Sequence, residues 1–199
     1  MNSFKAACLR YSLIKPKTHK RAYEILRRMD GVIAPRGAEL GVYRGFLSAI
    51  LLRSRRDLRL FMVDSWEGAG GSYAENSEDP MAAIDQQGMD ALHEETSRRT
   101  DFAGERRSIL RLRTDVATAR IADASLDFCF VDADHSYEGC KADIAHYAAK
   151  VKSGGWLGGH DYARPGYPMF GVTAAVDEVA ASRGAKLECG LDYTWFVRM

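Results

Sequence analysis

The sequence lacks an excess of charge of either sign and lacks any long apolar run. Its 199 residues carry 28 Lys and Arg against 27 Asp and Glu, a formal net charge of +1. This balance supplies neither a basic field nor an acidic tail, so we expect no nucleic-acid and no membrane partner. No apolar run reaches the roughly 18 residues needed to span a bilayer, and residues 1–21 lack the apolar stretch of a signal peptide. We therefore expect a cytoplasmic protein.

Paired cysteines are also missing. The 4 cysteines are widely spaced and form no CxxC motif, which argues against a disulfide framework and a zinc ribbon. No internal repeat or low-complexity segment is present either. A hydrophobic content of 46% suffices for a core, and the length fits one domain of roughly 100–200 residues.

Short apolar runs alternate with helical patterns after Gly31. The runs occupy residues 37–42, 58–64, 108–113, 126–132, 154–159 and 193–198. Continuous apolar strands separated by helices are typical of a parallel sheet covered on both faces, so we predict an α/β, doubly wound fold. A helical stripe over residues 18–29 precedes them. We expect a basic leader and helix over residues 1–30 and a single domain over residues 31–199.

Residues 67–107 interrupt this rhythm with a long polar stretch. The first part, up to Pro80, is rich in Gly, Asp and Glu, and the second part, residues 82–99, has a helical pattern. Long loops in compact domains are often functional, and this one follows a strand whose carboxyl end faces the ligand edge of the sheet. We interpret residues 67–107 as a lid. A surface excursion without ligand contact is the alternative.

A glycine turn, AELGVYRG at residues 38–45, joins the first apolar run to a helix. Gly41 and Gly45 allow the backbone to approach a ligand, and the following helix N-terminus favours a polar group. The spacing is not GxGxxG, and the Glu39 carboxylate would repel a diphosphate. A ligand with a positive charge near Glu39 is therefore predicted, although a tight turn alone would also need glycine.

Asp64 ends the second apolar run about 20 residues after the glycine turn. From this position a carboxylate accepts hydrogen bonds from ribose hydroxyls. Trp66 is a candidate for stacking on a purine. The alternatives are a solvated strand end for Asp64 and core or lid packing for Trp66, but their order after Glu39 and the glycine turn favours a nucleoside site.

Ionisable side chains gather after two further apolar runs. Asp132 ends the run over residues 126–132 and is followed by Asp134 and His135, and His160 and Asp161 follow the run ending at residue 159. Packing does not call for such clusters, because buried unpaired charge is costly. Neighbouring parallel strands bring their carboxyl ends together, so Asp132, His160 and Asp161 are predicted to be able to share one cation.

These blocks resemble the class I S-adenosylmethionine-dependent methyltransferases of the methyltransferase family 24 type. The resemblance covers about residues 37–198 and rests on the order of AELGVYRG, VDSWEG, TDVATA, VDADHSYEG, GGWLGGHDY and FGVTAAVDEV. It implies a Rossmann-like seven-stranded sheet of order 3-2-1-4-5-7-6 with the last strand antiparallel. It also implies S-adenosylmethionine as cofactor.

The resemblance carries a cofactor site onto this sequence. Glu39 and the glycine turn would lie by the methionine moiety, Asp64 would hold the ribose, and Asp115 in TDVATA would face the adenine amino group. The implied cofactor-binding residues are Glu39, Gly41, Tyr43, Gly45, Asp64, Ser65, Trp66, Asp115 and Asp132.

Metal-dependent O-methyltransferases of this fold are similar at a second level. The resemblance assigns Asp132, His160 and Asp161 to a divalent metal site and His135, together with Asp132, to catalysis. His160 stands where Asp or Glu is usual, which leaves Mg²⁺ against Mn²⁺, Fe²⁺ or Zn²⁺ open, as well as the metal requirement itself. An imidazole with an ordinary pKa near 6.5 suits a general base at neutral pH. The alternative for His135 is to orient Asp161.

The resulting prediction is a methyltransferase acting on a small-molecule hydroxyl. A non-catalytic nucleoside-binding protein is one alternative, and a nucleic-acid methyltransferase, suggested by basic runs, is another. The DADH sequence lacks the Pro-Pro-aromatic motif of amino-methylating nucleic-acid enzymes. The leader helix is a candidate surface for a homo-oligomer. The predicted acceptor pocket consists of Tyr73, Met81, Tyr162, Tyr167, Met169 and Phe170.

Overall fold

A seven-stranded sheet forms the centre of the molecule. The computed structural model describes residues 19–68, 71 and 79–199. The strand order is β3-β2-β1-β4-β5-β7-β6, and β7 runs antiparallel to β5 and β6 while the remaining pairs are parallel. The predicted α/β class and strand order are confirmed. The strands are β1 (Arg36–Leu40), β2 (Arg59–Asp64), β3 (Arg107–Arg111), β4 (Leu126–Val131), β5 (Val151–Gly159), β6 (Leu187–Cys189) and β7 (Trp195–Arg198).

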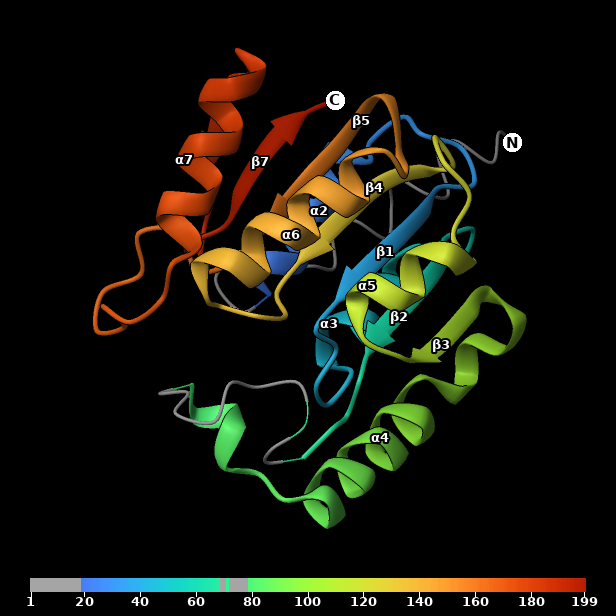
Figure 1. Ribbon diagram of the computed structural model, residues 1–199. Coiled ribbons are helices and arrows are strands. Elements are labelled where there is room, and N and C mark those ends of the chain that lie inside the picture. Colours follow the sequence, from blue (N-terminus) through green and yellow to red (C-terminus); the bar gives the residue numbers. More distant parts are fainter. Residues whose placement is uncertain (1–18, 69–70, 72–78) are drawn as a thin grey trace.

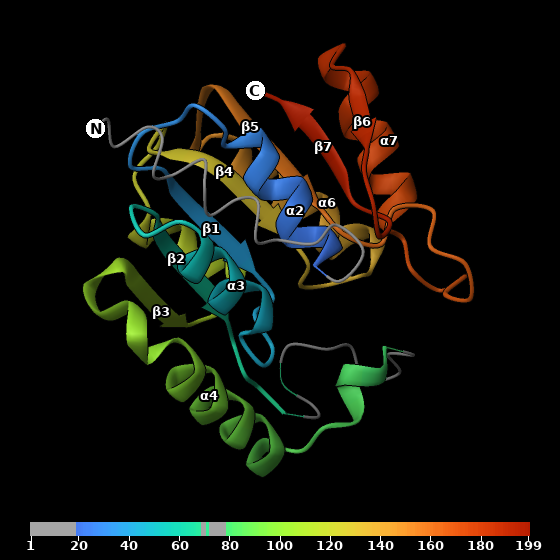
Figure 2. The same cartoon turned by 180° about the vertical axis from the view of Figure 1, so that it is seen from behind.

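Helices cover both faces of the sheet. Figure 1 shows α5, α6 and α7 in front of it, and the reverse view in Figure 2 shows α2, α3 and α4 on the other face. Their bounds are α2 (Lys20–Arg28), α3 (Phe46–Ser54), α4 (Gln86–Thr100), α5 (Thr114–Ala117), α6 (Tyr137–Ala148) and α7 (Val172–Arg183), with 3-10 turns η1 (Pro80–Ala83), η2 (Asp101–Arg106) and η3 (Thr118–Arg120). Within the described residues, no helix has both the length and the apolar character needed to cross a membrane.

The central strand β4 is largely apolar because both of its faces are buried. In β4, Phe128 and Phe130 join the core under α2 and α3, whereas Cys129 and Val131 join the core under α6 and α7. Successive side chains of a strand point to opposite faces, so one run of residues serves both cores. Because these side chains are used in the two cores, the residues available for contact with a ligand lie at the ends of the strands.

The segment predicted as a lid contains the crossover between β2 and β3. Parallel neighbours require such a connection, and α4 supplies it, close to the helix expected over residues 82–99. The Thr96 hydroxyl donates to the Tyr43 carbonyl at 2.8 Å, which fixes α4 against the glycine turn. Residues 69–70 and 72–78 lie outside the described part of the chain. A lid function for residues 67–107 stays a prediction.

Candidate active site

A cavity of about 730 Å³ lies at the carboxyl ends of β1, β2, β4 and β5. This is the edge at which open α/β sheets bind ligands. Most of the predicted site residues line it, namely Glu39, Gly41, Tyr43, Asp64, Ser65, Trp66, Asp132, His135, His160 and Asp161. Strand topology therefore brings together side chains that lie far apart in the sequence.

Gly41 brings the end of β1 against the end of β4. Its φ is +80°, and a Cβ placed there would lie 1.8 Å from the Asp132 carbonyl oxygen. Gly45, with φ of +70°, precedes α3 and faces Thr96. The predicted turn thus needs glycine for both backbone conformation and close approach. Gly45 itself does not line the cavity.

The Asp64 carboxylate holds this turn to the end of β2. Its Oδ2 accepts hydrogen bonds from the N–H groups of Val42 (2.9 Å) and Tyr43 (2.8 Å), and its Oδ1 accepts from the Trp66 N–H (2.8 Å). Burial raises the pKa of Asp64, and these three donors oppose the rise. A carboxylate has about four acceptor sites, so capacity for a further donor remains.

Glu39 is a buried acid on the same side of the cavity. It is 2% exposed, and its carboxylate accepts a hydrogen bond from the Ser48 hydroxyl on α3. Burial raises the pKa of Glu39 to about 8, against the effect of the Ser48 bond. The acid is therefore largely neutral at pH 7, and a cation beside it would favour its charged form.

The surroundings of Trp66 and Asp115 bear on two of the predicted cofactor contacts, which stay predictions. The Trp66 ring is 1% exposed, donates from Nε1 to the Tyr43 carbonyl at 2.9 Å and packs edge-on against His93, so it offers no open face to a purine. Asp115, on α5, does not line the cavity, and its side chain pairs at 3.2 Å with Arg113, which does. The structure does not bring Asp115 to the other predicted residues.

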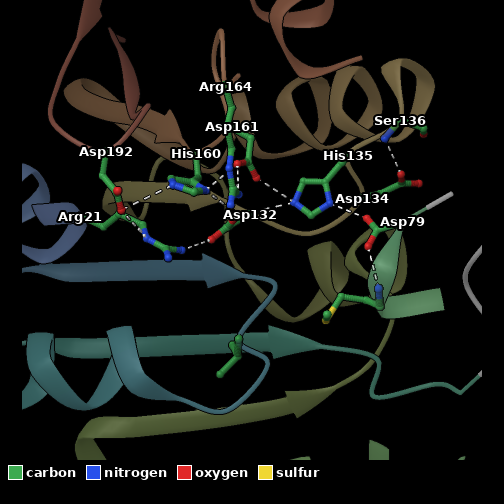
Figure 3. Close-up of polar contacts among 12 residues, drawn as sticks. Arg21, Asp79, Asp132, Asp134, His135, Ser136, His160, Asp161, Arg164 and Asp192 are labelled. Carbon is green, nitrogen blue, oxygen red and sulfur yellow. Dashed lines mark hydrogen bonds and ion pairs between the residues drawn. The ribbon is translucent and has the colours of Figure 1, made fainter. Parts of the chain in front are cut away.

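His135 lies among three carboxylates that also line the cavity, those of Asp79, Asp132 and Asp161 (Figure 3). Its Nδ1 is 2.5 Å from Asp79 Oδ2, and its Nε2 is 3.1 Å from Asp161 Oδ2 and 3.7 Å from Asp132 Oδ1. Burial alone would lower the pKa of His135, but the hydrogen bonds with Asp132, Asp161 and Asp79 raise it to about 11. The expected ordinary pKa is therefore wrong for this arrangement, in which the imidazole holds its proton.

His160 approaches the same two strand-end carboxylates. Its Nδ1 lies 3.0 Å from Asp161 Oδ1 and 3.5 Å from Asp132 Oδ1. Burial would lower the pKa of His160, yet these carboxylates raise it to about 9. Burial would raise the pKa values of Asp132 and Asp161, but bonds with both histidines lower them. The predicted cluster is thus assembled, with its charges already compensated.

Two arginines that the sequence analysis did not assign complete the cluster. Arg21 of α2 donates to Asp132 Oδ2 at 2.8 Å and lies 3.2 Å from Asp192 Oδ2, while Arg164 donates to Asp161 Oδ1 at 2.6 Å. Arg21 and Asp132 are 111 residues apart in the sequence, and no spacing pattern links them. The leader helix, expected only as a basic surface, contributes directly to the cavity wall.

The carboxylates retain donor atoms that suit a divalent cation. Within the described residues, one ligand atom each from Asp132, His135 and Asp161 lie within 4.8 Å of one another. The arginines take one oxygen of each carboxylate, and the other oxygen of each faces His135. Partners of this kind orient ligands in metal sites. The carboxylate oxygens suit such an ion, and His160 Nδ1 also lies 3.5 Å from Asp132 and 3.0 Å from Asp161, so the metal set of Asp132, His160 and Asp161 stays a prediction.

Only some of the residues predicted for the acceptor pocket line the cavity. Met81, Tyr167 and Phe170 line the cavity, whereas the Tyr162 hydroxyl donates to Asp177 and the Met169 side chain is 43% exposed. Tyr73 lies outside the described residues.

Residues 38–162, which carry the glycine turn and both acidic strand ends, match a family model described as a methyltransferase domain, of the family 24 type. The chain belongs to this methyltransferase family. It is a class I methyltransferase by both motif order and sheet order.

Solved structures show the same fold. The O-methyltransferase NovP superposes with a TM-score of 0.65 at 19% identity, over 92% of this chain and 79% of that chain. The calicheamicin methyltransferase CalS11 gives 0.64 at 15% identity, over 92% and 78%. The O-methyltransferase TomG from Streptomyces achromogenes, solved with S-adenosylmethionine, gives 0.58 at 14%, over 100% and 90%. Comparison with curated proteins returns no significant match.

Proposed function

We propose that this methyltransferase transfers the methyl group of S-adenosylmethionine to a hydroxyl of a small-molecule acceptor. The observation that supports this most is one cavity with two chemically different walls. We call Glu39 and Asp64, at the ends of β1 and β2, the first wall, and His135 with Asp132 and Asp161, after β4 and β5, the second wall; all five residues line the same cavity. NovP and TomG, which share this fold, are both O-methyltransferases, and this supports the assignment.

The first wall suits the methyl donor. S-Adenosylmethionine carries a sulfonium and an amino group, and Glu39 is a buried acid without a paired cation in its hydrogen bonds among the described residues. The Gly41 turn gives the backbone room for the methionine moiety, and the remaining acceptor site of Asp64 suits a ribose hydroxyl. In this proposal Tyr43 and Ser65 flank the donor and Asp115 does not touch it.

The second wall suits the acceptor. An acceptor oxygen held near His135 would displace the sulfur in line, with alignment supplying most of the rate gain. The hydroxyl proton must leave, and His135 can take it only after its own proton has been released, for which charge at Asp132 and Asp161 must be compensated. A divalent cation, when bound by these carboxylates, would supply that compensation and lower the pKa of the hydroxyl.

The test measures methyl transfer and donor binding in the same variants. Transfer of labelled methyl groups to a panel of phenolic and sugar hydroxyls is followed for wild type, His135→Ala and Asp132→Asn, with His146→Ala as control. His146 is exposed on α6 and touches no wall of the cavity. We expect transfer to fall at least about 100-fold in the first two variants.

Calorimetric titration with S-adenosylmethionine should give similar affinities for all four proteins, because His135 and Asp132 belong to the acceptor wall. Full methyl transfer by both His135→Ala and Asp132→Asn would refute the assignment of His135 and Asp132 to the acceptor wall. Binding without any methylated product across the panel would instead favour a non-catalytic nucleoside-binding protein.

A further inference from the structure

The loop between β5 and α7 folds back on the His135 ring. The Phe170 ring stacks on the His135 imidazole with centroids 4.2 Å apart and planes 10° apart. Tyr167 stacks with Phe170 at 4.9 Å and 30°, and the Arg164 guanidinium lies 4.2 Å from the Tyr167 ring centroid. Four side chains thus form one continuous stack that begins at Arg164 and ends at His135.

The two ends of this stack meet at one carboxylate. Arg164 donates to Asp161 Oδ1 at 2.6 Å, and Asp161 Oδ2 lies 3.1 Å from His135 Nε2 (Figure 3). The contacts therefore close a circuit through Phe170 and Tyr167. Because each member touches two others, displacing one loosens the constraint on the rest.

The loop backbone is fixed at the same place. The Gly171 N–H donates to the His135 carbonyl at 2.8 Å, and the Phe170 N–H donates to the Tyr167 carbonyl at 3.1 Å. A Cβ on Gly171 would lie 2.3 Å from the Tyr137 nitrogen, so the chain passes too close to α6 for a side chain there. This close approach places the Phe170 ring directly over the imidazole.

We propose that Phe170 is a positioning residue for His135, supported by Tyr167 and Arg164. The carboxylates of Asp79 and Asp161 contact the two ring nitrogens, and two contacts of this kind leave the tilt of the ring about the line between those nitrogens weakly restrained. A parallel aromatic ring at 4.2 Å restrains that tilt. Phe170 is committed to protein partners by its two stacks, so it supports the acceptor wall rather than serving as a stacking surface for the acceptor.

The orientation of His135 matters because it decides where Nε2 points. Proton transfer and metal ligation both require the nitrogen lone pair to be aimed at its partner, and small misplacements reduce rates strongly. The importance for turnover rests on the proposed methyl transfer. The claim that Phe170 restrains the orientation of the His135 ring does not depend on methyl transfer. The orientation of the ring and its importance for turnover can therefore be tested separately.

The test records ring-proton NMR signals of histidine-labelled protein with S-adenosylhomocysteine added. The His135 signal is identified by its loss in His135→Gln. Stacking on Phe170 should shift it upfield; Phe170→Leu should remove this shift and Phe170→Tyr should keep it. Met169→Ala, in the same loop but 43% exposed, should leave it in place. If Phe170→Leu fails to fold, Tyr167→Leu replaces it, with a smaller movement expected.

For an acceptor methylated by the wild type, kcat should fall about tenfold in Phe170→Leu, return in Phe170→Tyr, and leave the KM for S-adenosylmethionine unchanged. An unmoved His135 signal in Phe170→Leu, or a loss of kcat that Phe170→Tyr does not restore, would overturn the positioning role. Absence of transfer by the wild type with the predicted NMR shifts would count against the methyl-transfer function alone.

Discussion

The two walls of the cavity hold their carboxylates in opposite ways. Glu39 and Asp64, on the ends of β1 and β2, receive hydrogen bonds from a hydroxyl and from backbone N–H groups, and their pKa values are raised. Asp132 and Asp161, after β4 and β5, are held by arginines and histidines, and their pKa values are lowered.

This contrast assigns different tasks to the two walls. Neutral donors leave a buried acid poorly compensated, so the first wall gains most when a cationic ligand arrives. Cationic side chains compensate the second wall beforehand, so it can hold a fixed geometry around His135 without ligand. The same residue type thus supports cation binding on one side and preorganisation on the other.

The largest effect is expected at the turn that supports the first wall. Asp64→Ala removes the acceptor of three N–H groups, those of Val42, Tyr43 and Trp66. The N–H groups of Val42 and Trp66 are partly buried, and each costs about 1 kcal/mol or more when left unsatisfied, so the free energy of unfolding should fall by about 2 kcal/mol. Urea unfolding would show this, with Asp123→Asn, an exposed carboxylate, as control. A loss near that of the control would mean that Asp64 does not hold the turn.

A second change acts on the charge of the first wall. Glu39→Gln keeps a hydrogen-bonding side chain but cannot become negative, so the affinity for S-adenosylmethionine should fall about 10-fold to 100-fold. In the wild type the affinity should rise with pH up to about 8, because the carboxylate forms through that range. Calorimetry across this range should show a flat profile for the variant. A wild-type affinity that falls as pH rises would contradict the assignment.

A third change tests whether burial alone raises the pKa of an acid that does not line the cavity. Asp143 on α6 is 3% exposed, and burial raises its pKa from 3.8 to about 7 against a hydrogen bond from Thr114. It lies outside the cavity lining. A raised folded pKa means that its stability contribution is full below about pH 4 and is lost as pH rises through about 7.

Asp143→Asn should therefore match the wild type near pH 4 and exceed its stability above about pH 7. Unfolding curves at several pH values measure the difference. S-Adenosylmethionine should leave this difference unchanged, because no cation reaches Asp143. Equal pH profiles for both proteins would show that burial does not shift this acid.

The sequence was sufficient for the features that depend on local pattern. Apolar runs located six strands. Residues at or just beyond the carboxyl ends of four of these strands, including Glu39, Asp64, Asp132 and Asp161, line one cavity because parallel strands end together. The run-based analysis missed β6, whose three residues are all at least partly exposed. A short edge strand carries too little apolar pattern to be recognised.

Side-chain contacts between residues far apart in the sequence could not be predicted from local pattern. Arg21 meets Asp132 only through the docking of α2, and Asp79 meets His135 only through the path of the β2–α4 connection. The pKa of His135 depends on these contacts, so its departure from the ordinary value could not be predicted. The burial of the Trp66 ring could not be predicted, because an aromatic residue after a strand has the same sequence pattern whether it packs inward or faces a ligand.

The most direct test of the contrast between the walls is the proton count on binding of S-adenosylmethionine. Titrations at pH 7 in buffers of different ionisation enthalpy give this number. If the Glu39 carboxyl is neutral before binding and ionises beside the bound S-adenosylmethionine, the wild type should release about one proton on binding. Glu39→Gln should release almost none. Binding by the wild type without proton release would contradict the account.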